Sequence, residues 1–135
     1  MARRENLDES SNDSRPPTSG EDSLLAKVLT VSDGVVAGER QDKSGEALVS
    51  ALISHSFEVL EHRVVADGVE SVADSLTEMS NGFAGLIITT GGTGFTERDL
   101  TPEGTLRVIE RNAPGIAEAM RLTNPLGRLS RGVAG

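Results

Sequence analysis

Three short apolar runs, separated by segments with helical spacing, are the feature that most limits how this chain can fold. The runs are LLAKVLTV (24–31), FEVLEHRVV (57–65) and AGLIITT (84–90), and turn-forming residues follow each of them. Short apolar runs bounded by turn residues are typical of strands buried in a parallel sheet. Strand and helix alternate along the chain, and right-handed crossovers then predict an α/β fold with helices on both faces of the sheet.

Four segments carry apolar residues at helical spacing or residues that begin and end helices: 42–55, 69–80, 101–112 and 115–122. Asp42 is a suitable cap for the first of them, and Asn81-Gly82 a suitable end for the second. Thr101 is the expected cap of the third, with Pro102 at its first position. The stretch 35–42 is predicted to be a polar loop, and 123–127 a turn.

Composition excludes several classes of function. The 135 residues fit one domain, and residues 1–22 are too polar to bury a core, so we expect a disordered tail before a domain spanning 23–135. The net charge of −8, without a basic stripe, Trp or Tyr, argues against nucleic-acid binding. The chain has no Cys, which fits a cytoplasmic protein, and no apolar run reaches the length of a membrane span.

The predicted strands direct attention to the loops that follow them. Ligands of parallel sheets bind beyond the carboxyl ends of the strands, where the strand order reverses. Those loops contain Ser32-Asp33, 66–68 and 90–99. With a strand order of 2-1-3, all three would line one crevice.

The loop after the third run, TTGGTG (89–94), is rich in glycine. Glycine lets the backbone approach a ligand closely, and successive N–H groups in such turns form anion-binding concavities. We therefore interpret Thr90, Gly91, Gly92, Thr93 and Gly94 as a phosphate-binding loop. The alternative is a glycine turn that only leads out of the sheet. The spacing matches neither a dinucleotide fingerprint nor a P-loop.

Two aspartates near these loops have both a functional and a structural interpretation. Asp99, next to the glycine loop, could hold a Mg²⁺ ion that also contacts phosphate, or could only favour the following helix N-terminus. Asp67 with Glu70 resembles a capping box, and the spacing alone favours a cap. Ser32 and Asp33 could likewise form only a strand-ending turn.

Four further residues remain open from the sequence. His55 and His62 lack metal-binding spacing, so we expect structural or surface roles for them. Arg98 could clamp a phosphate but is more simply a solvated side chain. Phe95 could stack on a flat ligand or fold back onto the core.

Longer motifs then resemble a known family. VSDGVVAGERQDKSG (31–45), TTGGTGFTERDLTPEGT (89–105), APGIAEAMR (113–121) and LSRGVAG (129–135) resemble the MoaB/Mog family of molybdenum cofactor biosynthesis proteins. The resemblance begins near Leu24 and implies a three-layer α/β/α domain with a mostly parallel sheet that binds molybdopterin and forms a homotrimer. Catalytic members adenylylate molybdopterin with MgATP and release pyrophosphate.

The resemblance also implies roles by position. Asp67 and Asp99 correspond to the two aspartates that matter for activity, and Asp99 is the expected Mg²⁺ ligand. Ser32, Asp33 and the loop 90–94 correspond to the pocket for the pterin phosphate and the nucleotide. The implied ligands are Mg²⁺, ATP and molybdopterin, and a molybdenum insertase is an implied partner protein.

Three interpretations of the resemblance stay open. The first is a molybdopterin adenylyltransferase, the second a non-catalytic molybdopterin-binding protein, and the third a related domain detached from an insertase or a nucleotide-metabolising protein. Relatives continue past the last motif with another strand, a Leu-Pro-Gly-Ser-Pro-type turn and a closing helix. We therefore expect the C-terminal part of the domain to be missing from this chain.

Overall fold

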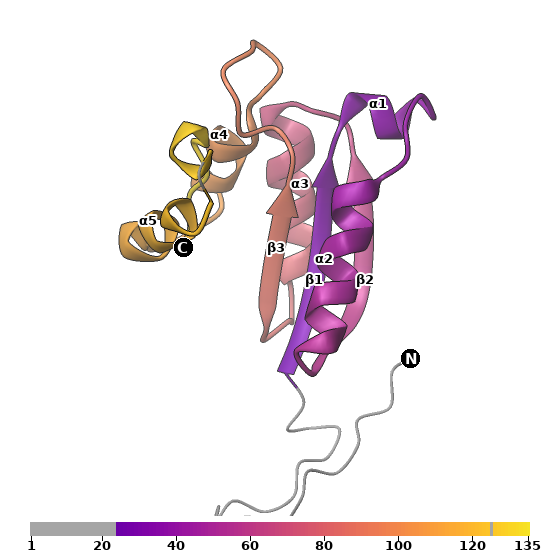
Figure 1. The fold of residues 1–135 in the computed structure, drawn as a ribbon, viewed down its shortest axis with the longest axis vertical. Coiled ribbons are helices and arrows are strands. Elements are labelled where there is room, and N and C mark those ends of the chain that lie inside the picture. Colours follow the sequence, from indigo (N-terminus) through magenta and orange to yellow (C-terminus); the bar gives the residue numbers. More distant parts are fainter. Residues whose placement is uncertain (1–23, 125) are drawn as a thin grey trace, which may run out of the picture.

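Three parallel strands form the centre of the molecule. The structure, a computed structural model, describes residues 24–124 and 126–135, so the expected tail at 1–22 lies outside it (Figure 1). The strands are β1 (Leu24–Val31), β2 (Phe57–Val65) and β3 (Leu86–Thr90). Their order is β2-β1-β3, with both neighbours parallel to β1. Because the strands are parallel, their carboxyl ends lie at one edge of the sheet, and this order places the loop after β1 between the other two.

Helices cover both faces of the sheet. α2 (Lys43–Ser54) lies in front of the strands in Figure 1, and α3 (Val69–Ser80) behind them. Residues of β1 alternate between the two faces, as a strand requires. Val28 packs with Leu52 of α2, while Leu29 packs with Val72 of α3. The predicted three-layer α/β/α arrangement is therefore confirmed.

The short helices differ in part from the prediction. α1 (Asp33–Val36) occupies the start of the expected polar loop, because the Ser32 hydroxyl accepts a hydrogen bond from the N–H of Val35 at 3.2 Å and caps a single turn. α5 (Pro114–Leu122) matches the predicted fourth helix, and a 3₁₀ turn, η2 (Gly127–Leu129), follows it.

The third predicted helix was wrong in its end and in its cap. α4 spans only Thr101–Leu106 instead of 101–112. The chain after α4 pairs with the C-terminal segment, where Ala113 donates its N–H to the carbonyl of Ala134 at 2.7 Å. Thr101 lies inside the helix, and its hydroxyl is buried without a protein partner among the described residues, so it caps nothing. Its N–H bonds the carbonyl of Gly92 at 3.1 Å, which joins α4 to the glycine loop.

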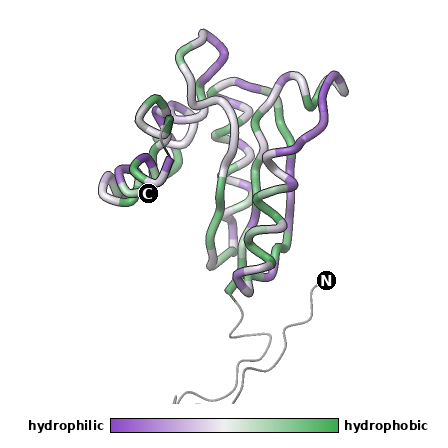
Figure 2. The backbone as a smooth tube through the Cα atoms, in the orientation of Figure 1, coloured by the Kyte–Doolittle hydropathy of each residue, from purple (hydrophilic) through white to green (hydrophobic). Residues whose placement is uncertain are grey.

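Apolar residues, green in Figure 2, follow the strands and recur along the long helices, and several also occur in the C-terminal part. On α5, Ile116 and Met120 are each 59% exposed, and Leu122 is 80% exposed. Within the described ranges, no helix is both long and apolar enough to cross a bilayer.

Candidate functional site

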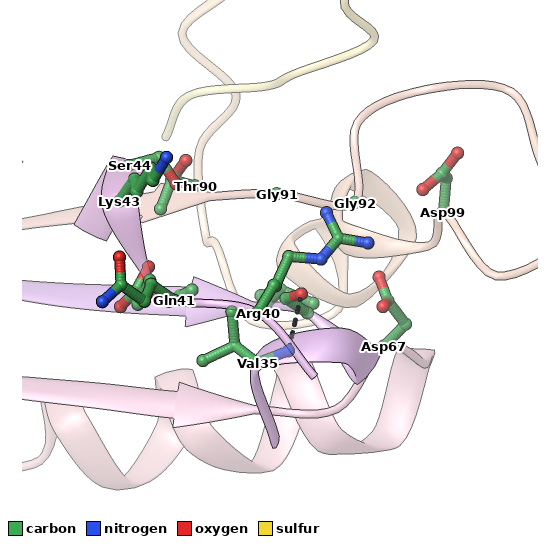
Figure 3. Close-up of a pocket in the computed structure, with 14 residues that line it drawn as sticks. Val35, Arg40, Gln41, Lys43, Ser44, Asp67, Thr90, Gly91, Gly92 and Asp99 are labelled. Atoms are coloured by element: carbon green, nitrogen blue, oxygen red, sulfur yellow. Dashed lines mark hydrogen bonds between the residues drawn. The ribbon is translucent and has the colours of Figure 1, made fainter. Parts of the chain in front are cut away.

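A cleft of about 450 Å³ opens at the carboxyl ends of β1 and β3 (Figure 3). The end of β1 (30–32), the segment 40–44, the glycines 91–92 and two carboxylates, Asp67 and Asp99, line it. The segment 40–44 leads into the first turn of α2 and contributes the basic residues Arg40 and Lys43. Acidic and basic side chains thus face the same space, a pattern suited to a charged ligand.

The glycine loop has a backbone that other residues rarely adopt. Gly91 and Gly92 have φ angles of +97° and +69°. A Cβ atom on Gly91 would overlap the backbone carbonyl oxygen of Val31, and one on Gly92 would overlap the Thr101 hydroxyl. The bare backbone at both positions is therefore a steric requirement of the way β3 turns into α4.

Three backbone N–H groups of this loop have no acceptor in the part of the chain that the structure describes. Among residues 24–124 and 126–135, no hydrogen bond uses the N–H of Gly92, Thr93 or Gly94 as its donor. Successive N–H groups that water or a ligand must satisfy form a concavity suited to an anion. The loop therefore has the donors that a phosphate needs.

Asp67 joins the β2 loop to the β1 loop, and the interpretation of Asp67 as a helix cap was wrong. Gly68 precedes α3, and no side chain caps that helix. The Asp67 carboxylate instead accepts the N–H of Asp33 at 2.9 Å, and the Asp33 carboxylate accepts the N–H of Asp67 at 3.0 Å. This reciprocal pair leaves Asp67 Oδ1 directed at the glycine loop, 3.2 Å from where a Cβ on Gly92 would lie.

Arg98, in the loop after β3, bonds both Asp33 and Asp67. Its Nε and Nη2 donate to the two carboxylate oxygens of Asp33, each at 3.0 Å, and Nη2 also donates to the Asp67 carbonyl. The Arg98 guanidinium, followed by the Asp67 N–H, holds the pKa of the Asp33 carboxyl below its ordinary value. Arg98 is therefore neither freely solvated nor open to a phosphate while this pair is closed.

Asp99 is held within its own loop. Its Oδ2 accepts the N–H of Thr96 at 2.9 Å and the Thr96 hydroxyl at 2.8 Å. These two bonds, the N–H first, keep the pKa of the Asp99 carboxyl below its ordinary value. Asp99 therefore faces the cleft as a carboxylate at neutral pH, and both of these bonds use Oδ2.

Arg131 is a residue of this site that the sequence reasoning did not single out. Its guanidinium donates to the carbonyls of Gly94 (2.7 Å) and Asp99 (2.6 Å) and to the Glu103 carboxylate (2.8 Å). Its own N–H bonds the Thr93 carbonyl at 3.0 Å. The C-terminal segment thus holds both ends of the 93–99 loop. The motif LSRGVAG was visible in the sequence, but nothing in its spacing indicates which loop it contacts.

The predicted site residues divide into two groups. The cleft itself is lined by Ser32, Asp67, Thr90, Gly91, Gly92 and Asp99. Asp33 lies beside it in the pair with Arg98, while Thr93 and Gly94 are the part of the loop that Arg131 contacts. Phe95 is 75% exposed and lies over the Arg131 guanidinium, 5.7 Å from the ring centre, so it does not fold onto the core.

The described residues of the cleft do not form a metal site made of protein ligands alone. Within the described part of the chain, no three His, Asp or Glu side chains converge as metal ligands. Mg²⁺ differs from other metals in that it keeps several waters and typically takes one or two carboxylates plus phosphate oxygens. Asp67 and Asp99, which both line the cleft and lie next to Gly92 and Gly94, fit that need. We therefore regard the donor set as suitable for Mg²⁺ that arrives with a phosphate.

The family model described as "Probable molybdopterin binding domain" matches residues 27–127 of this chain. Molybdopterin adenylyltransferase of Helicobacter pylori J99 is 38% identical over 115 residues, which cover 80% of this chain and 65% of that protein. The enzyme of the same name from Escherichia coli K12 is 36% identical over 102 residues, covering 73% and 52%. This chain therefore spans about half to two thirds of the length of these relatives.

Solved structures of molybdopterin biosynthesis proteins have the same fold as this chain. The molybdopterin biosynthesis enzyme MoaB from Thermus thermophilus superposes with a TM-score of 0.76 at 41% identity, covering 83% of this chain and 74% of that one. The molybdopterin biosynthesis Mog protein from Mycobacterium ulcerans gives 0.75 at 36% identity, covering 84% and 76%.

Proposed function

Because this chain belongs to the family of probable molybdopterin binding domains, as the MogA and MoaB proteins do, we propose that it acts in molybdenum cofactor biosynthesis by adenylylating molybdopterin. The substrates are molybdopterin and ATP, and pyrophosphate is the second product. The names of the two curated relatives support this reaction.

The observation that carries the proposal is the glycine loop with two carboxylates lying against it. The N–H groups of Gly92, Thr93 and Gly94 lack protein acceptors among the described residues. The Asp67 carboxylate lies next to Gly92, and the Asp99 carboxylate lies next to Gly94. A cluster of donors alone would attract any anion. Donors together with acids suit a phosphate that is accompanied by a divalent cation.

The reaction needs no protein nucleophile. An oxygen of the molybdopterin phosphate, already ionised at neutral pH, forms a bond to the α-phosphorus of ATP, and the bond from that phosphorus to the bridging oxygen breaks to release pyrophosphate. Such transfers depend mainly on positioning and on stabilising the charge that develops. The glycine loop holds a phosphate, and the cations Arg40 and Lys43 line the opposite side of the cleft.

Asp99 and Asp67 have separate tasks in this proposal. Asp99 would hold Mg²⁺, which would supply positive charge next to the phosphate oxygens. Asp67 orients the metal or the ribose, and its reciprocal bonds with Asp33 keep its carboxylate in place. The low pKa of Asp99, caused by the two Thr96 bonds, keeps that ligand ionised well below neutral pH.

Pyrophosphate release with purified chain, molybdopterin, ATP and Mg²⁺ tests the proposal. We expect Asp99→Asn to lower kcat/KM by roughly 100-fold, because it removes a charge at the reacting phosphates. Glu97→Gln is the matched control, since Glu97 is an exposed acid of the same loop, and it should change activity less than twofold.

Three outcomes separate the interpretations. Equal losses in both variants would remove Asp99 from the mechanism. Binding of molybdopterin without pyrophosphate release would favour the non-catalytic binding protein. Failure to bind either substrate would contradict the proposed function itself.

The exposed apolar face of α5 supports a further part of the proposal, that copies of the chain associate as the resemblance implies. Ile116 and Met120 lie one turn apart on one face of α5 and are each 59% exposed. Contiguous exposed apolar surface is usual at contacts between proteins. Sedimentation equilibrium should give a trimer, and a monomer at micromolar concentration would contradict this part.

A further inference from the structure

A polar cluster lies at one wall of the cleft, where β1, β2 and α2 meet; Thr30 and Asp42 line the cleft, and His62 lies behind them. The Thr30 hydroxyl donates to Asp42 Oδ2 at 2.8 Å, and His62 Nε2 lies 2.8 Å from the same oxygen. Asp42 Oδ1 accepts the N–H of Gly45 at 3.0 Å. Thr30 is 2% exposed, and the side chains of Asp42 and His62 are 10% and 27% exposed. The sequence reasoning gave His62 only a structural or surface role and did not connect it to the site.

The contacts fix which ring nitrogen of His62 carries a proton. An ionised carboxylate oxygen can only accept, so the Nε2 that lies 2.8 Å from Asp42 must donate. Nε2 also lies 3.1 Å from the Thr30 hydroxyl. One nitrogen thus contacts both partners, whereas a catalytic relay of the Ser-His-Asp type uses both nitrogens of the ring. His62 is therefore placed to hold Asp42, not to activate Thr30.

Gly45, in the first turn of α2, packs directly against the side chains of the cluster. A Cβ on Gly45 would overlap Asp42 Oδ2 and the Thr30 hydroxyl, and His62 Nε2 is adjacent. The first turn of α2 therefore rests directly on the cluster. Arg40, Gln41, Asp42, Lys43 and Ser44 line the cleft opposite the glycine loop, and Figure 3 shows the Arg40 guanidinium extending toward the side where Asp67 and Asp99 lie.

We propose that His62, through Asp42, is a positioning residue that sets where the basic wall of the cleft, Arg40 and Lys43, stands relative to the glycine loop. The class of ligand that this wall would recognise is the polyphosphate of a nucleotide, and this part rests on the proposed function. His62 touches no substrate. Its loss should therefore weaken nucleotide binding without altering the chemical step.

Kinetics with MgATP test the proposal. His62→Leu should raise KM for MgATP by about tenfold, because it removes a hydrogen bond to a charged group, while kcat stays within about twofold. His62→Gln, whose amide can again donate to Asp42, should restore most of the KM. His55→Leu is the matched control: His55 is the other histidine of the chain, is exposed at the end of α2, and should leave KM unchanged.

A double-mutant cycle separates positioning from general loosening of the fold. If His62 acts through the basic wall, Lys43→Ala and His62→Leu should be clearly less than additive in KM, since neighbours that share one function couple. A fall in kcat with KM unchanged, or full additivity, would overturn the proposal. The proposal would also be overturned if His62→Gln had the thermal midpoint of the wild type but did not recover the wild-type KM.

NMR on the wild-type protein tests the same inference without any ligand. The ¹⁵N shifts should show His62 with its proton on Nε2, and the Gly45 amide should exchange more slowly than in His62→Leu. A proton on Nδ1 alone, or unchanged Gly45 exchange, would overturn the positioning role. An inactive wild type would count against the proposed function, and these spectra would still decide the role of His62.

Discussion

Replacing Gly91 with alanine should destabilise the domain by about 2 to 5 kcal/mol. A residue with a Cβ in the left-handed region costs about 1–2 kcal/mol, and Gly91 has a φ of +97°. The new Cβ would also overlap the carbonyl oxygen of Val31. That oxygen belongs to the backbone at the end of β1 and cannot rotate away, so overpacking adds about 1–3 kcal/mol. The total is a large part of the roughly 5–15 kcal/mol that stabilises a domain.

Two other glycines separate the cost of the left-handed backbone from the cost of the steric overlap. Gly38 has a φ of +76° but open space where a Cβ would lie, so Gly38→Ala should cost only about 1–2 kcal/mol. Gly115 has open space and lies in α5, so Gly115→Ala should stabilise by about 0.5 kcal/mol.

Urea unfolding followed by circular dichroism measures all three variants. For Gly91→Ala the midpoint should fall by about 1–2 M, at the m-value of a small domain. If Gly91→Ala were no less stable than Gly38→Ala, the overlap with Val31 would have no energetic consequence. The steric account of the glycine loop would then be wrong.

Two further predictions concern the contacts that hold this loop. Arg131→Gln removes the donors to Gly94, Asp99 and Glu103, so kcat/KM for adenylylation should fall about tenfold, and unchanged kinetics would show that the clamp does not position Asp99. Arg98 lowers the pKa of the Asp33 carboxyl, and Thr96 lowers the pKa of the Asp99 carboxyl. Both carboxylates therefore contribute their full stabilisation above the ordinary Asp pKa of about 4. That stabilisation is lost as the pH falls through the lower pKa values of the folded protein. The free energy of unfolding from urea titrations should stay level between about pH 7 and 5 and fall below about pH 4, and Arg98→Leu should make that fall shallower; an equally steep fall in both proteins would contradict the role of the pair.

The strands and the long helices could be predicted from the sequence, because the pattern that marks each of them lies within the segment itself. Buried strands appear as apolar runs and helices as spaced apolar residues, and both signals lie within a few residues of one another. The order β2-β1-β3 was raised only as a condition, since no local pattern states which strand lies beside which. Once it holds, the convergence of Ser32, Asp67 and Thr90 on one cleft follows.

Contacts between segments that are distant along the chain could not be predicted from the sequence. Asp67 has the spacing of a helix cap, yet its carboxylate goes to the N–H of Asp33, 34 residues away. Arg131 reaches back to Asp99, and His62 to Asp42. The helix predicted at 101–112 was too long, because the chain turns after Leu106, where the N–H groups of Val108 and Ile109 both bond the carbonyl of Thr105. Single-residue roles in the site thus depend on partners that periodicity cannot identify.

A crystal structure with molybdopterin and MgATP bound tests the central claim most directly. The account predicts a phosphate within hydrogen-bond distance of the N–H groups of Gly92, Thr93 and Gly94, with Mg²⁺ coordinated by Asp99. A phosphate bound elsewhere in the cleft, with those N–H groups turned to solvent or to the protein's own side chains, would contradict it.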